Sequence, residues 1–127
     1  MRKFVLLVLL VGLMAIGLTS AQAHTQGALI DNVYVNGSGQ VLAITGRITC
    51  TAGESFLLRV NARVEDGDTA IGKAGGNCTG SPQEWTTGEE QTFGSLEVGP
   101  AAGHMQVHTE DGNVRSFSDK AQVVQVI

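Results

Sequence analysis

The sequence predicts an all-β fold: an antiparallel, immunoglobulin-like β-sandwich of about seven or eight strands with one disulfide. Apolar and polar residues alternate along several short segments, as in strands that have one buried and one solvated face. Turn sequences rich in Gly and Asn separate these segments at regular intervals. The chain also contains two cysteines, an even number. A small closed barrel is the alternative architecture.

Residues 1–23 have the features of a secretory signal peptide. The segment starts with the positive MRK, continues with an apolar run, and ends in AQA, a small-x-small cleavage site. The apolar run has about 15 residues, whereas a membrane-spanning helix needs roughly 20. Cleavage after Ala23 would release a secreted (extracellular) β-sandwich domain of residues 24–127, with no membrane association.

Residues 24–127 are acidic. Six basic and twelve acidic residues follow Ala23, which gives this part a formal charge of −6. The basic residues are scattered along the sequence and form no basic run. We therefore expect neither nucleic acid nor an anionic membrane as a partner, because the charge gives no reason to bind either.

The first three strands are expected between residues 28 and 66. ALIDNVYV is the first, and NGSG then forms a hairpin turn, because Gly and Asn tolerate positive φ. QVLAITGRITC follows, with Gly46 as a site for a bulge. Its inward residues are expected to be Leu42, Ile44, Ile48 and Cys50. SFLLRVNARVED alternates most clearly, with Phe56, Leu58, Val60, Ala62 and Val64 on one face and Leu57, Arg59, Asn61 and Arg63 on the other.

The remaining strands are shorter or weaker in pattern. EDGD is a turn, and TAIGKAGGNC is a strand loosened by its glycines. CTGSPQ is a loop, and QEWTT is a short strand that carries Trp85. Three further strands are expected in QTFGSLEV, GHMQVHT and AQVVQVI, with a turn at EDGN (110–113).

Cys50 and Cys78 are the only cysteines, and in an exported chain they predict one disulfide. They have no CxxC spacing and no neighbouring His, so the spacing favours neither a redox pair nor a metal site. A structural disulfide of this loop length contributes about 3–4 kcal/mol in the chain-entropy model. Trp85 is expected to pack in the core against this disulfide, with a ligand-stacking role as the alternative.

The two cysteine-bearing segments, GRITCTAGESFLLRV and GGNCTGSPQEWTTG, carry a resemblance to a known family. They resemble an uncharacterised family of small secreted actinobacterial proteins, catalogued as a domain of unknown function. The matching pattern is Cys-Thr-x-Gly, then Cys, then Trp, at Cys50, Thr51, Gly53, Cys78 and Trp85. The similarity covers roughly residues 30–126. It implies a secreted bacterial β-sandwich with a disulfide, and it implies no activity or binding residues.

Three histidines follow the expected cleavage site. His24 would be the mature N-terminus, where its amine and its imidazole could together bind Cu(II). His104 and His108 occur as HMQVH, a spacing that pairs two side chains on a helix. On the expected strand they share a face but lie about 13 Å apart, too far to bind one metal. We therefore expect both to be solvent-facing and assign no metal site to them.

No pattern of catalytic residues is recognisable. No Ser/His/Asp arrangement or nucleophile elbow occurs, and both cysteines are expected to be oxidised. The acidic clusters EDGD, EE and TEDGN lack the spacing of a calcium loop and are interpreted as solvated turns. We therefore expect no enzyme activity and no cofactor.

These observations predict a secreted non-catalytic protein that binds an extracellular protein, a wall polymer or a small ligand. The alternative is a copper-binding protein that uses His24. A third hypothesis, a protease inhibitor, would require a rigid exposed loop, for which TGSPQEW (79–85) is the candidate.

Overall fold

The computed structural model of the protein describes residues 27–110 and 112–126. The expected signal peptide (1–23) and His24 lie outside the described residues. The described part folds into eight strands: β1 (Gly27–Val35), β2 (Val41–Thr49), β3 (Ser55–Arg63), β4 (Thr69–Asn77), β5 (Gln83–Thr86), β6 (Gly88–Phe93), β7 (Gly99–Thr109) and β8 (Val114–Gln125). The predicted all-β fold of seven or eight strands with one disulfide is confirmed. The described residues contain no helix with the length and hydropathy of a membrane span.

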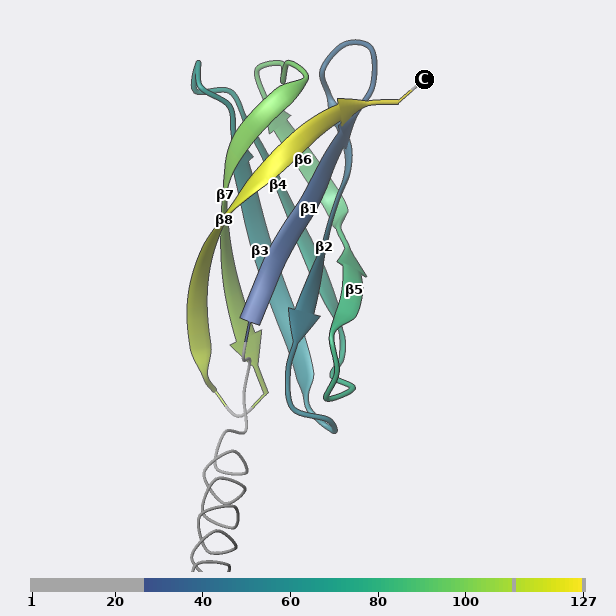
Figure 1. The fold of residues 1–127 in the computed structure, drawn as a ribbon, viewed down its shortest axis with the longest axis vertical. Helices are drawn as coiled ribbons and strands as arrows, with labels where there is room; N and C mark the ends of the chain where they lie inside the picture. Colours follow the sequence, from purple (N-terminus) through teal and green to yellow (C-terminus); the bar gives the residue numbers. More distant parts are fainter. Residues whose placement is uncertain (1–26, 111, 127) are drawn as a thin grey trace, which may run out of the picture.

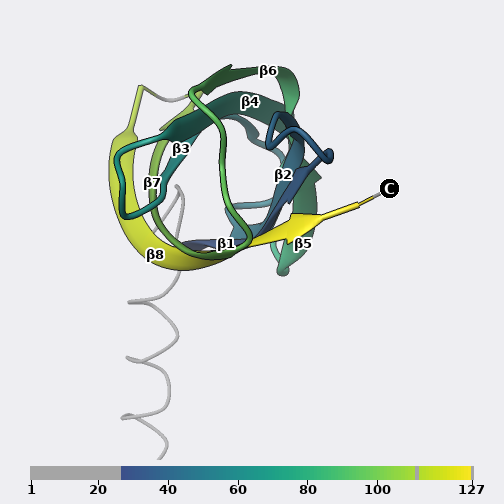
Figure 2. The same cartoon turned by 90° about the horizontal axis from the view of Figure 1, so that it is seen from above.

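The eight strands form one sheet in the order β5-β2-β1-β8-β7-β3-β4-β6. Every neighbouring pair is antiparallel except β1 and β8, which are parallel. The sheet curls around the core, so that β1, β2 and β5 face β3 and β4 across the interior (Figures 1 and 2). The architecture is therefore a sandwich in which the pairing of β1 with β8 joins the two layers into one continuous sheet.

β5 and β6 are the two edge strands of the sheet, and one continuous segment of the chain connects them. β5 pairs with β2 and β6 pairs with β4, so this segment crosses from one layer to the other at Thr87. The Thr87 backbone N–H donates to the Ile44 carbonyl at 3.0 Å, and Thr87 Oγ1 accepts from the Ile44 N–H at 2.9 Å. A Cβ at Gly72 would lie 2.8 Å from two Thr87 side-chain carbons. Glycine at 72 therefore lets the crossing segment lie against β4.

The core consists of the inward side chains of both layers. The alternation expected for β3 is confirmed, since Phe56, Leu58, Val60, Ala62 and Val64 are all buried. The largest fully buried side chains come from β1, β2, β3, β7 and β8, and Cys50 is also fully buried, as expected. They pack as one hydrophobic cluster. A single core of this kind requires both layers, because neither could cover its apolar face alone.

One inward position expected in β2 is wrong. Leu42 is 48% exposed, while Val41 packs against the core. Tyr34 of β1 pairs with Ala43 and Val35 pairs with Val41, so Leu42 is an extra residue in the ladder. Because a bulge reverses the alternation, the side chain of Leu42 points to solvent.

The bulge expected at Gly46 occurs in the partner strand. Ile30 pairs with Gly46 and Asn32 with Thr45, which leaves Asp31 as the extra residue. A Cβ at Gly46 would collide with the Leu29 carbonyl oxygen and with the indole of Trp85. The indole lies against the backbone of β2, and any side chain at position 46 would overlap it, so this position requires glycine. Trp85 is 3% exposed, which confirms it as a core residue and excludes it as an accessible stacking surface.

The Cys50–Cys78 disulfide is present as predicted, with a Cα–Cα distance of 5.3 Å. It joins the residues that follow β2 and β4, and both cysteines are buried. Two backbone hydrogen bonds reinforce the link, from Gly80 N–H to the Cys50 carbonyl at 3.0 Å and from Gly53 N–H to the Cys78 carbonyl at 3.3 Å. The disulfide therefore ties together two loops at one end of the sandwich.

The later strands differ most from the expected boundaries. β6 ends at Phe93, so the second half of QTFGSLEV is not a strand, and its Leu96 is buried instead. β7 begins at Gly99 and β8 at Val114, both earlier than expected. The sequence did not predict the first half of β8, because this segment carries little apolar alternation. In the structure this half pairs with β7 alone.

Candidate functional site

Five neighbouring strands, β6, β4, β3, β7 and β8, present one continuous outer face. Their register sets the outward residues in rows across the strands, which we name by their β3 member. The Asn61 row consists of Gln91, Ile71, Asn61, His104 and Ser118. The Arg59 row consists of Lys73, Arg59, Gln106 and Ser116. The Arg63 row consists of Phe93, Thr69, Arg63, Ala102 and Lys120.

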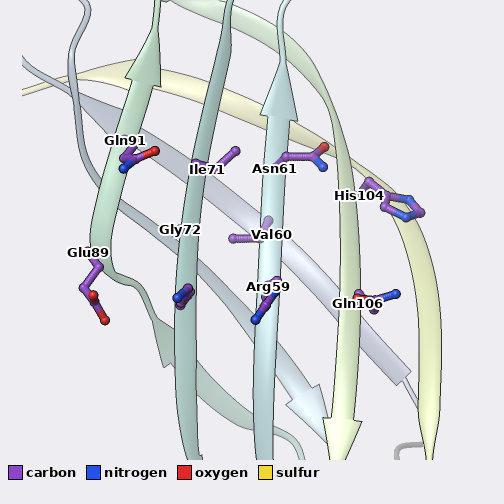
Figure 3. A pocket seen from close by; sticks show the side chains of 10 residues that line it. Arg59, Val60, Asn61, Ile71, Gly72, Glu89, Gln91, His104 and Gln106 are labelled. Atoms are coloured by element: carbon purple, nitrogen blue, oxygen red, sulfur yellow. The ribbon is translucent and has the colours of Figure 1, made fainter.

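Two shallow depressions lie on this face and share Asn61 and His104. The first has a volume of about 540 Å³ and lies over β6, β4, β3 and β7. The second, of about 700 Å³, continues over β3 and β7 to β8. We call the two together the outer trough. The residues around the first depression come from four adjacent strands (Figure 3).

Basic side chains gather at the outer trough. Arg59, Lys73, Arg63 and Lys120 line it, which is four of the six basic residues that follow Ala23. All four are exposed, and none forms a salt bridge with any residue of 27–110 or 112–126. The basic residues that are scattered in the sequence are therefore brought to one face by the sheet.

Arg59 and Lys73 are directly opposite each other on β3 and β4. Like charges in directly opposed positions destabilise a sheet, by an amount on the order of 0.2–1 kcal/mol. No carboxylate within the described residues forms a salt bridge with either side chain, so no ion pair offsets the repulsion between them. An anion bound between the two side chains would relieve this repulsion.

Two carboxylates also line the trough. Asp119 is half-buried, and its Oδ2 accepts from the Ile30 backbone N–H at 3.0 Å while its Oδ1 accepts from the Lys120 N–H at 2.8 Å. Glu89 lies at the opposite end, beside Gln91. Four basic and two acidic residues give the trough a formal charge of +2, whereas the domain as a whole carries −6.

Glu89 has an unusual backbone. With a φ of 54°, it is the one non-glycine residue of the described chain in the left-handed region. Ile71 pairs with Gln91 and Lys73 with Gly88, so Glu89 and Glu90 together oppose Gly72 in a bulge. The bulge directs Glu89 to the trough, while Glu90 Oε2 accepts a hydrogen bond from Thr87 Oγ1 at 2.7 Å. Bulges and positive φ at non-glycine residues both concentrate at functional sites.

The two histidines of HMQVH lie on the outer face as expected, in different rows. His104 Nδ1 is 3.4 Å from Ser118 Oγ, and His108 Nε2 is 3.2 Å from Gln106 Oε1. Among the described residues, no group of three or more His, Cys, Asp or Glu side chains could hold a metal ion. His24 lies outside the described residues, so copper binding stays a prediction.

The acidic turns and the TGSPQEW loop also have defined places. Asp66 Oδ1 accepts from the Asp68 N–H at 3.1 Å within the EDGD turn, and Asp68 Oδ2 accepts from the Ser95 N–H at 3.1 Å, which connects the turn to the segment after β6. In the loop, Gln83 Oε1 accepts from the Thr79 N–H at 2.9 Å. The loop is exposed and tied to itself, but Trp85 at its end is buried.

The sequence contains a partial signal for the trough. The polar residues that alternate with the β3 core residues predict an outward face that contains Arg59, Asn61 and Arg63. The opposition of Arg59 to Lys73 could not be predicted, because it depends on the register between β3 and β4.

Comparison with known proteins adds little beyond the fold. No protein-family model matches this sequence, and no curated protein matches it. Among solved structures, the chain is similar to murine CRIg, with 10% sequence identity over 80% of this chain and 98% of that chain. The TM-score is 0.36, and a likeness at this level carries no argument about what this chain binds.

Proposed function

We propose that this protein is a secreted, non-catalytic binding domain and that the outer trough is its binding surface. The observation that carries the proposal is the directly opposed and unpaired Arg59–Lys73 pair within a depression of the sheet. An arrangement that disfavours folding and is kept at a concave surface is typical of a site shaped by a ligand. The predicted signal peptide and the disulfide support an extracellular location.

The chemistry of the trough favours binding over catalysis. His104 and Ser118 are its nearest approach to a nucleophile and base, at 3.4 Å between Nδ1 and Oγ. Both side chains are exposed, and no carboxylate of the described residues hydrogen-bonds to His104 to orient its ring. A Ser/His pair without that orienting group lacks the geometry of an activated nucleophile. The trough instead offers cations and amides, which are groups that bind.

The proposal is tested by NMR titration of ¹⁵N-labelled protein. The probes are inorganic phosphate, a galacturonate decamer and a glutamate decamer, at low ionic strength. We expect at least one probe to shift the amide resonances of β3, β4 and β7 around the trough. The R59Q/K73Q variant should lose these shifts.

The matched control is R47Q/R115Q, which removes two positive charges outside the trough. Arg47 forms a salt bridge with Asp31 at 3.0 Å, and Arg115 lies 5.6 Å from the centre of the Phe117 ring. Shifts that persist in R59Q/K73Q, shifts that map elsewhere, or no shifts with any probe would contradict the proposal.

A further inference from the structure

We propose that the ligand of the outer trough is an anionic polysaccharide, an inference that rests on the proposed function. The trough has the dimensions of a site for an extended chain. It crosses five strands, and at about 4.8 Å between strands its length across the sheet is about 19 Å. It is shallow and open along this length, whereas a site for one small molecule encloses most of its ligand.

The cations are spread over the trough, both across the strands and along them, rather than collected at one point. Arg59 and Lys73 form one group, and Arg63 and Lys120 form a second, on either side of Ala102 in the Arg63 row. Lys73 on β4 and Lys120 on β8 are three strand spacings apart, or about 14 Å across the sheet, and Arg59 and Arg63 are about 13 Å apart along β3. Two separated groups of cations match a chain that carries repeated carboxylates or sulfates, because each group can bind a different anionic unit.

The side chains between the two groups of cations suit hydroxyl groups. Asn61 and Gln91 lie in the row between the two groups, and Gln106 lies beside Arg59; each amide offers both donors and an acceptor. Sugar hydroxyls likewise donate and accept, so a polysaccharide can satisfy these amides between its anionic groups. Phe93, which is 57% exposed, lies at the β6 end of the Arg63 row, where a sugar ring could pack on its face.

The same surface is poorly suited to an acidic protein or peptide. The centre of a protein interface is usually apolar, with aromatic anchors in pockets. Here the central Asn61 row is mainly polar. The exposed apolar side chains lie away from it: Phe93 is at the β6 end of the Arg63 row, and Leu57 and Val114 are in the row of His108. An extended peptide cannot add as a strand at β4, β3 or β7, because each of these three strands pairs on both sides.

The test measures the affinity of the full mature protein for three oligomers by isothermal titration calorimetry. The oligomers are a galacturonate decamer, a heparin-derived decasaccharide and a glutamate decamer, with a galacturonate trimer as the length control. We expect one of the two decasaccharides to bind at least tenfold more tightly than the glutamate decamer, and the trimer to bind more weakly than the longer chain. Added salt should weaken the binding, because exposed charges are screened.

The variants connect this affinity to the trough. R59Q/K73Q should lower the affinity for the preferred saccharide about tenfold, as expected for two exposed charge contacts of modest strength. R47Q/R115Q should stay within about twofold of the unmodified protein.

Equal or tighter binding of the glutamate decamer at the trough would overturn the polysaccharide and leave the proposed function standing. Failure of all three decamers to bind at the trough would overturn the polysaccharide, and if inorganic phosphate also fails to shift the trough resonances, the proposed function is overturned as well.

Discussion

Gly46→Ala tests the packing at the centre of β2. The added methyl group would collide with the Trp85 indole and with the Leu29 carbonyl oxygen. Neither can move freely, because Trp85 is buried and Leu29 is paired with Arg47 in the β1–β2 ladder. Overpacking of this kind costs typically about 1–3 kcal/mol, and the backbone contact places this case at the upper end, about 3 kcal/mol.

Urea unfolding measures this loss. For a domain of this size, a slope of about 1 kcal/mol/M converts the loss into a midpoint lower by about 2–3 M. The control is Gly88→Ala, because a Cβ at Gly88 has no heavy atom within 4 Å, and its midpoint should change by less than about 0.5 M.

A second variant isolates the indole contact. In a Trp85→Phe background the ring is smaller, so Gly46→Ala should cost less than it does beside Trp85, and the difference is the coupling energy of the pair. A midpoint for Gly46→Ala close to that of the unmodified protein would show that the indole does not lie against β2 as described.

Four further predictions concern other parts of the molecule. Reduction of Cys50–Cys78 should lower the free energy of unfolding by about 3–4 kcal/mol, measured by urea unfolding with and without a reductant, and an unchanged midpoint would show that the disulfide contributes nothing. Thr87→Val should cost about 1–3 kcal/mol in the same assay, because it leaves a buried β2 N–H without its acceptor, and a neutral result would mean that the crossing segment is not held there. Lys73→Gln should stabilise the fold by up to about 1 kcal/mol by removing the charge repulsion on the outer face, whereas a destabilised variant would show that the pair is compensated. Mass spectrometry of the exported protein should find His24 at the N-terminus, and Cu(II) titration of that protein then decides the copper hypothesis, since weak binding rejects it.

Local pattern was sufficient for much of the fold. The alternation from Phe56 to Val64 predicted β3 and its buried face, because side-chain direction in a strand has a period of two. The pairing of Cys50 with Cys78 required no structure, because two cysteines in an exported chain allow one disulfide. The buried position of Trp85 was also predicted.

Other features depended on what lies beside each strand. The bulge that turns Leu42 to solvent arises from the ladder between β1 and β2, and β2 alone gave no sign of it. The start of β8 was missed because that half of the strand is stabilised by pairing with β7, and pairing partners leave no periodic signal in a single segment.

The sequence by itself determined the fold class, the disulfide and the inward face of the clearest strand, because each of these depends on local alternation or on a count of residues. Only the tertiary structure decided where charge gathers. Arg59, Arg63, Lys73 and Lys120 come from three strands, and they share one surface because the register of β4, β3, β7 and β8 aligns them. Register is a property of pairs of strands, so an acidic chain with scattered basic residues can carry a basic trough that its sequence does not reveal.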